Sequence, residues 1–99
     1  MWELRARRTD PARPVSFRLM PGAVKTIGRA RAADFCLDVP FVSRLHCRVE
    51  VGPDGAVEVV DLGSTNGTWV DGKRVSRATL ARGSVLRVGR VEFALEPCG

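Results

Sequence analysis

Short β-strand patterns separated by turn residues run through the whole chain, and they restrict its fold more than any other feature. In residues 2–7, 15–19 and 91–96, apolar and polar residues alternate. This period of two predicts strands with one buried face. Further short runs of strand-forming residues are 24–28, 35–39, 46–51, 56–62, 68–70, 73–75 and 84–88. No stretch has a sustained helical period, so the chain is predicted to be all-β.

Turn residues separate these runs at intervals of roughly 8–12 residues, which is typical of a β-sandwich or barrel. The pairs Asp71-Gly72 and Gly89-Arg90 predict two-residue hairpins, and Gly52-Pro53-Asp54-Gly55 predicts a longer one. With 99 residues the chain has a common domain size. It contains no linker or internal repeat, so residues 1–99 are predicted to form a single domain.

Two polar loops are expected to lie side by side. If residues 46–51 pair with 56–61, the segments just outside this hairpin, 42–46 and 62–68, meet at its open end. The first offers a hydroxyl, a guanidinium and an imidazole, and the second offers hydroxyls and an amide. Functional residues tend to lie in loops carried by a rigid scaffold. The pair of loops is therefore a candidate site.

Three motifs give the chain a family resemblance. They are Gly28-Arg29, Ser43-Arg44-Leu45-His46 and Ser64-Thr65-Asn66-Gly67-Thr68, in that order. On a chain of short strands this combination resembles a forkhead-associated (FHA) domain, a phosphothreonine-binding module. The resemblance implies an eleven-stranded β-sandwich of two mainly antiparallel sheets, of the SMAD/FHA-like kind, with the binding loops at one end.

The resemblance also implies the residues that hold the ligand. A phosphate monoester carries about −1.5 to −2 charges and three acceptor oxygens at neutral pH, so it calls for converging donors, at least one of them cationic. By resemblance the phosphate-contacting residues are Arg29, Ser43, Arg44 and Thr65. Asn66 would hold the peptide main chain, because its amide can both donate and accept.

Four further residues have supporting roles by the same resemblance. Gly28 and Gly67 are expected to be structural, Gly67 because glycine adopts positive φ without cost. His46 is expected to support the loops from behind without touching ligand. Phe41, in the apolar segment 40–42, is a candidate specificity residue. That segment predicts an aliphatic side chain at the third residue after the phosphothreonine.

Other roles for these residues stay open from the sequence. Ser43 and Thr65 could cap their own turns. Arg44 could pair with Asp61 or Asp38. Strict reversal of direction at every strand would even place Arg29 at the end opposite Ser43, and only the resemblance brings them together.

The charge admits a rival function. A net charge of +5, with fourteen Arg against two Lys, would attract nucleic acid, acidic membranes or phosphorylated partners. Zinc-finger spacing, an RNP-like aromatic strand and a basic helix are all absent. The expected partner is therefore a phosphothreonine protein or peptide, not nucleic acid, a membrane or a small-molecule substrate. The alternatives are a basic nucleic-acid-binding β domain and an FHA-fold scaffold that has lost phosphate dependence.

Catalysis, metals and cofactors are not expected. The chain has one histidine, no evident base–nucleophile pair and no phosphate-loop lysine. Neighbouring His46 and Cys47 would point to opposite faces of a strand, which disfavours a zinc site. The N-terminus lacks a signal-peptide pattern, and three cysteines cannot all pair within the chain. We therefore expect a cytoplasmic monomer, or a nuclear one in a eukaryote.

Overall fold

The chain folds into eleven β-strands. The computed structural model describes residues 1–7 and 15–98. None of these residues forms a helix, and so they include no membrane-spanning helix. The strands are β1 (Trp2–Ala6), β2 (Ser16–Leu19), β3 (Val24–Gly28), β4 (Phe35–Cys36), β5 (Cys47–Val51), β6 (Val57–Asp61), β7 (Thr68–Val70), β8 (Lys73–Val75), β9 (Arg77–Leu80), β10 (Val85–Val88) and β11 (Val91–Pro97).

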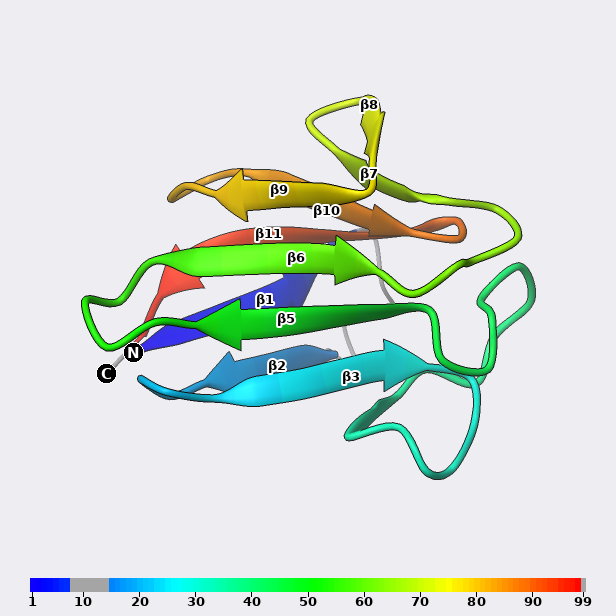
Figure 1. The fold of residues 1–99 in the computed structure, drawn as a ribbon, viewed down its shortest axis with the longest axis horizontal. Coiled ribbons are helices and arrows are strands. Elements are labelled where there is room, and N and C mark those ends of the chain that lie inside the picture. Colours follow the sequence, from blue (N-terminus) through cyan, green and yellow to red (C-terminus); the bar gives the residue numbers. More distant parts are fainter. Residues whose placement is uncertain (8–14, 99) are drawn as a thin grey trace.

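The strands form two sheets that pack face to face (Figure 1). The six-stranded sheet has the order β2-β1-β11-β10-β7-β8, and the five-stranded sheet has the order β4-β3-β5-β6-β9. Among the strand pairs given a register, only β3 and β4 are parallel. The predicted all-β sandwich of eleven strands in two mainly antiparallel sheets is confirmed.

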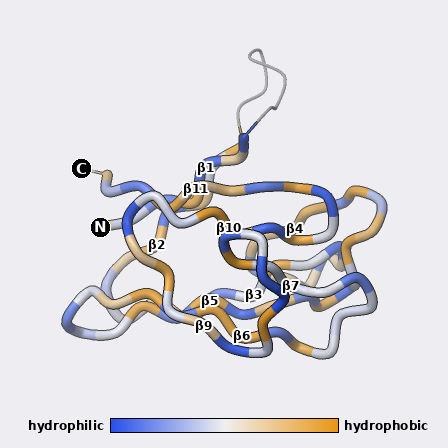
Figure 2. The backbone as a smooth tube through the Cα atoms, turned by 90° about the horizontal axis from the view of Figure 1, so that it is seen from above, coloured by the Kyte–Doolittle hydropathy of each residue, from blue (hydrophilic) through white to orange (hydrophobic). Residues whose placement is uncertain are grey.

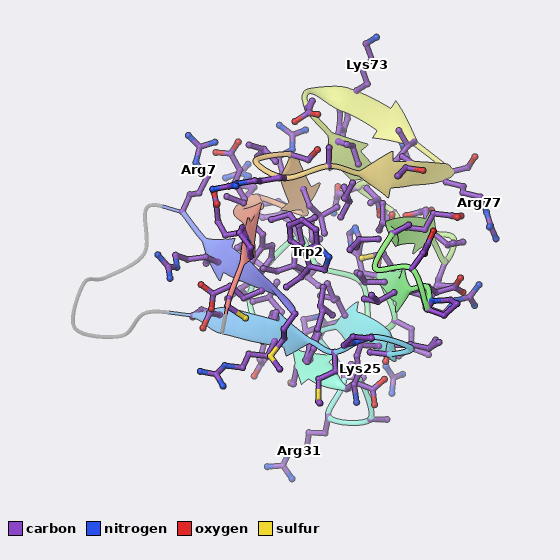
Figure 3. All side chains as sticks on the ribbon, turned by 90° about the vertical axis from the view of Figure 1, so that its left-hand side faces the viewer. Trp2, Arg7, Lys25, Arg31, Lys73 and Arg77 are labelled. Carbon is purple, nitrogen blue, oxygen red and sulfur yellow. The ribbon has the colours of Figure 1, made fainter. Side chains whose placement is uncertain are left out.

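Apolar side chains from both sheets fill the space between them. Hydrophobic and hydrophilic segments alternate along the strands (Figure 2), as expected where one face of each sheet is buried. Fully buried members include Leu4, Leu19, Ile27, Val49, Val59, Leu86, Phe93 and Leu95. Trp2 points into the interior, whereas Lys73 and Arg77 point outwards (Figure 3). The rings of Phe17 and Phe35 stack 4.4 Å apart and join the two edge strands, β2 and β4.

The predicted hairpins have the expected geometry. In the β5–β6 hairpin Cys47 lies opposite Asp61 and Val51 lies opposite Val57. Asp71 and Gly72 join β7 to β8 with φ of 49° and 83°. Two positive φ angles define the type I′ turn that matches the twist of the strands. The Asp71 side chain also accepts a hydrogen bond from the main chain of Val85, at 2.9 Å, which ties this hairpin to β10.

Two strand boundaries differ from the prediction. The run 35–39 is a strand only over β4, because the chain turns after Cys36: Val39 N–H donates to the carbonyl of Leu37 at 3.0 Å. Strand β9 is not among the runs found by pattern, although the family's eleven strands imply one more. It presents only Ala78 and Leu80 inwards, between exposed Arg77 and Thr79. So short a pattern is too weak to stand out.

The two ends of the sandwich differ. The segments after β3, before β5, after β6 and between β10 and β11 gather at the right-hand end of Figure 1. The two chain ends lie at the left, where Cys98 N–H donates to the carbonyl of Met1 at 3.0 Å. Because β3 and β5 are antiparallel neighbours, the end of β3 and the start of β5 lie at the same end. Arg29 and Ser43 are therefore brought together after all.

Candidate functional site

The two polar loops lie side by side, as the hairpin predicted. Thr65 N–H donates to Ser43 Oγ at 3.1 Å, and Asn66 Nδ2 donates to the carbonyl of Phe41 at 3.0 Å. Each bond joins residues more than twenty positions apart in the chain. Segments 41–46 and 62–67 therefore form one surface at one end of the sandwich.

Arg29 is attached to this surface by its own main chain and side chain. Its N–H donates to the carbonyl of Ser43 at 2.9 Å, and its Nε donates to the carbonyl of Val42 at 3.1 Å. The residue is exposed. Among the described residues its two terminal guanidinium nitrogens take part in no hydrogen bond. They are available to an anionic ligand.

Arg44 is an exposed cation on the same surface. Ion pairs in the described part of the chain join Arg5 to Glu3, Arg48 to Glu50 and Arg77 to Glu58, and none involves Arg44. Pairing with Asp61 or Asp38, the alternative left open by the sequence, is not found. Two guanidinium groups without a carboxylate partner thus stand on neighbouring segments.

Gly28 allows the segment with Arg44 to approach β3 closely. An ideal Cβ on Gly28 would lie 2.1 Å from the carbonyl oxygen of Arg44, far inside contact distance. The same carbonyl accepts a hydrogen bond from Ala30 N–H at 3.0 Å. The expected structural role of Gly28 has this physical reason: no side chain fits there.

The hydroxyl groups of Ser43 and Thr65 add donors to the surface that carries the two arginines. Ser43 Oγ accepts the bond from Thr65 N–H, so its own proton remains free to donate. Within residues 1–7 and 15–98 the Thr65 hydroxyl makes no hydrogen bond, and Thr65 is exposed. Neither hydroxyl caps its own turn. The arrangement combines two cations and two hydroxyl donors, which suits a tetrahedral anion.

His46 holds the two loops together from inside. Its side chain is fully buried. Nδ1 accepts a hydrogen bond from Ser43 N–H at 3.0 Å, which assigns the proton to Nε2, and Nε2 donates to the carbonyl of Gly67 at 2.8 Å. The imidazole therefore lies behind the surface, with both nitrogens occupied by loop main chain. His46 thus contacts both loops, which is the geometry that a supporting role requires.

Asp61 is an organising residue that we did not single out from the sequence. Its Oδ1 accepts hydrogen bonds from the hydroxyls of Ser64 at 2.5 Å and Thr68 at 2.7 Å. Its Oδ2 accepts from the main-chain N–H groups of Gly63 and Ser64, at 3.0 and 3.1 Å. Burial raises the pKa of this carboxyl, but the bonds from Ser64, Thr68 and Gly63 outweigh burial and lower it. The motif Asp-Leu-Gly-Ser is an Asx-turn signal that could have revealed it.

Three residues of the surface, Phe41, Gly63 and Gly67, have left-handed backbone. Gly67 has φ of 90°, as expected from its place after Asn66, and Trp69 Nε1 donates to the Asn66 carbonyl at 3.1 Å. Phe41 has φ of 71°, an uncommon value for a residue with a large side chain. Its ring is half exposed and carries the guanidinium of Arg90 3.9 Å from its centroid. Strain of this kind gathers at binding sites.

The Cys47 thiol is fully buried next to His46 in the chain. Burial, with a further contribution from the Asp61 charge, raises the pKa of the Cys47 thiol to about 12. A thiol with that pKa is not a nucleophile near neutral pH. In the part of the chain that the structure describes, no three His, Cys, Asp or Glu side chains gather in a metal-binding group.

The β-sandwich and its cross-linked loops, which carry two arginines without a carboxylate partner among the described residues, define the chain as a binding module. The family model of the FHA domain matches residues 25–89, more than half of the chain. The chain belongs to the FHA domain family.

The chain is similar to curated proteins of Mycobacterium tuberculosis. The chain is 40% identical over 75 residues to the ABC transporter ATP-binding/permease protein Rv1747 of Mycobacterium tuberculosis, covering 76% of this chain and 8% of that one. It is 36% identical over 72 residues to the glycogen accumulation regulator GarA of the same organism, covering 73% and 44%. The chain therefore spans less than half the length of either relative.

Two solved structures are similar over nearly the whole chain. The FHA domain of CT664 from Chlamydia trachomatis has a TM-score of 0.88 at 29% identity, covering 99% of this chain and 98% of that one. A structure from an analysis of phosphothreonine-dependent FHA domain interactions has a TM-score of 0.82 at 30% identity, covering 99% and 97%.

Proposed function

We propose that this chain binds phosphothreonine in partner proteins of Ser/Thr-kinase signalling. The carrying observation is the surface on which Arg29 and Arg44, both without a carboxylate partner among the described residues, stand with the hydroxyls of Ser43 and Thr65. Membership of the FHA family and the similarity to a domain studied for phosphothreonine-dependent interactions support the same function.

Each residue of the proposed site has a role in phosphopeptide binding that follows from its chemistry. The two guanidinium groups supply charge and paired donors to the phosphate oxygens. The hydroxyls of Ser43 and Thr65 donate to the remaining oxygens. Asn66 uses one N–H on Phe41, so its Oδ1 and second N–H remain for the main chain of the peptide. Gly28, His46 and Gly67 hold this geometry without touching ligand.

The proposed site should distinguish phosphate from a carboxylate. A glutamate brings one charge and two coplanar oxygens, so at least one donor of the site would be left unpaired, which costs about 1–3 kcal/mol. Phosphoserine keeps the phosphate but lacks a methyl group, whose burial contributes roughly 0.8 kcal/mol, or about fourfold in affinity. The methyl group also limits the rotamers that aim the phosphate.

Four peptides that differ at one residue test this function. Fluorescence polarisation should rank phosphothreonine above phosphoserine, with glutamate and unmodified threonine equally weak. Comparable binding of the glutamate peptide would mean that basic charge alone attracts the peptide. Equal binding of the phosphorylated and unmodified peptides would favour the scaffold alternative. A preference for DNA or RNA over all four would favour the nucleic-acid alternative.

The setting of this site is one domain in the cytoplasm. Residues 1–99 act as one FHA domain. This proposal is supported by β1 and β11, which lie outside the matched range 25–89 and pair with each other in the six-stranded sheet. Residues 8–14 and 99 lie outside the described part of the structure. The domain is a monomeric binding module and not an enzyme. Its three cysteines are free thiols, which suits the reducing cytoplasm.

A further inference from the structure

A pocket of about 460 Å³ borders the proposed phosphate surface. Its lining residues are Phe41, Asn66, Arg87, Gly89, Arg90 and Glu92. Phe41 and Asn66 belong to the two cross-linked loops, and the other four belong to β10, β11 and the turn between them. A peptide held by Asn66 therefore has this pocket within reach.

Two arginines give the pocket its chemistry. Arg90 is exposed and lies over the Phe41 ring, and Arg87 lies over the Trp69 ring with its guanidinium carbon 4.5 Å from the centroid. Neither is in an ion pair within the described residues. The Nε of Arg87 is buried and has no hydrogen-bond partner there. Stacking on an aromatic ring orients a guanidinium while leaving its edge free to donate.

Glu92 is the one acidic residue of the pocket lining. It lies opposite Arg87 in the β10–β11 register, yet no contact of ion-pair length joins the two. Two guanidinium groups against one carboxylate leave the lining with a net positive charge. An acidic group entering the pocket would meet unpaired donors, whereas an aliphatic group would leave them without partners.

The β10–β11 turn is fixed against the loop that carries Phe41. Gly89 has φ of 61°, and an ideal Cβ on it would lie 2.7 Å from the Phe41 carbonyl oxygen. That carbonyl also accepts the bond from Asn66 Nδ2. The pocket and the phosphate surface are therefore joined through the main chain of Phe41, and their spacing is set by close contact.

Two contacts limit the apolar surface that segment 40–42 can offer to a peptide. Val42 is only 3% exposed and belongs to the core, and Arg90 covers the ring of Phe41. The surface beside Phe41 is thus polar and basic. An aliphatic side chain could contact only the part of the Phe41 ring that Arg90 leaves exposed.

We propose that this pocket is a second anion subsite, which binds an acidic side chain, carboxylate or phosphorylated, a few residues from the phosphothreonine of the same peptide. The proposal rests on the proposed function, because it is the phosphothreonine that brings the peptide to the surface. The preferred partners would be segments with phosphothreonine in an acidic context.

A peptide series tests the subsite. One neutral phosphothreonine peptide is compared with copies that carry a single Asp, or a single Ile, Leu or Val, at each position within four residues on either side. Calorimetry should show one position at which Asp raises affinity about fivefold, and phosphoserine at that position should raise it further. No gain at any position, or a larger gain from Ile, Leu or Val, would overturn the proposal.

Variants locate the effect. In Arg90→Gln and Arg87→Gln the ratio of affinities for the acidic and neutral peptides should fall to about one, whereas Glu92→Gln should increase it. Arg82→Gln is the matched control, an exposed arginine in the turn before β10, and should keep the wild-type ratio. An unchanged ratio in both pocket arginine variants would overturn the proposal. Glu92→Gln gives an independent result if Arg87→Gln fails to fold.

The control peptide separates the two hypotheses. Binding of the neutral phosphothreonine peptide over its unphosphorylated copy tests the phosphate surface alone. If that preference holds while Asp has no effect, only the subsite is refuted. If that preference is absent, the proposed function itself fails.

Discussion

The Cβ position of Gly28 lies 2.1 Å from the main-chain oxygen of Arg44, so the end of β3 and the segment that carries Arg44 touch through main chain alone. Gly28→Ala must push this segment away. We expect the substitution to destabilise the domain by about 1–3 kcal/mol, as overpacking does, and to weaken phosphopeptide binding because Arg44 is displaced.

Gly52→Ala is the matched control for that substitution. Its Cβ would meet the flexible side chain of Asp54, at 2.8 Å, in the hairpin at the opposite end. Thermal unfolding should show little change in this variant, within about 0.5 kcal/mol. Equal behaviour of the two alanine variants would mean that the close approach at Gly28 does not matter.

Arg44→Ala should remove affinity while leaving the fold intact. A charge-assisted hydrogen bond contributes roughly 1.5–3 kcal/mol, so binding of a phosphothreonine peptide should fall about ten- to a hundredfold. The melting temperature should stay close to that of the wild type, because the side chain is exposed. Arg31, which lies between β3 and β4 and points outwards (Figure 3), provides the control Arg31→Ala. Wild-type affinity in Arg44→Ala, measured by calorimetry, would refute its role.

His46→Ala should have the opposite effect. The substitution leaves Ser43 N–H and the Gly67 carbonyl without their buried partner and opens a cavity behind the loops. Denaturant unfolding should show a loss of about 2–4 kcal/mol. At temperatures where the variant is folded, its peptide affinity should fall less than that of Arg44→Ala. A variant that melts normally yet cannot bind would place His46 in contact with ligand.

Asp61 should make the loop sensitive to acid. The pKa of the Asp61 carboxyl is lower in the folded state than in the unfolded state. Its contribution to stability is therefore complete well above the unfolded Asp pKa of about 3.9. That contribution is lost as the pH falls through the lower pKa of the folded state. Asp61→Asn should therefore be less stable than wild type at pH 7, and the difference should shrink as the pH falls below about 4.

The difference between the two proteins is the quantity to measure. The pKa of Asp34 is also lowered, mainly by a hydrogen bond from the main chain of Thr26, and it contributes to acid sensitivity in both. Parallel stability curves for wild type and Asp61→Asn between pH 7 and pH 3 would show that the hydrogen bonds of Asp61 do not depend on its charge.

The architecture could be predicted wherever a strand has several inward apolar residues. Alternation in β1, β2 and β11 is visible without any structure, and Asp-Gly identifies the β7–β8 turn. The alternation of apolar and polar residues does not predict a strand that is held mainly by neighbouring strands. Two-residue β4 exists because it lies along β3, and β9 because it pairs with β6 over the register from Leu80 to Arg77.

The site could be predicted in part for the same reason. The β5–β6 hairpin sets Ser43 beside Thr65 by simple geometry, whereas Arg29 reaches them only because β3 and β5 are neighbours in the sheet, which no local pattern reveals. The pocket arginines were missed altogether. Arg87 and Arg90 look like ordinary surface charges until β10 and β11 bring them next to Phe41.

The pairing of Met1 with Cys98 at the end opposite the loops has a practical consequence. A domain fixed to a bead or sensor chip through either terminus would face the solution with its binding surface uncovered. Because Met1 and Cys98 lie close together, the domain could be inserted into a surface loop of a host protein. The inserted domain would add phosphopeptide binding to the host protein, and the two ends of the host loop would stay close together.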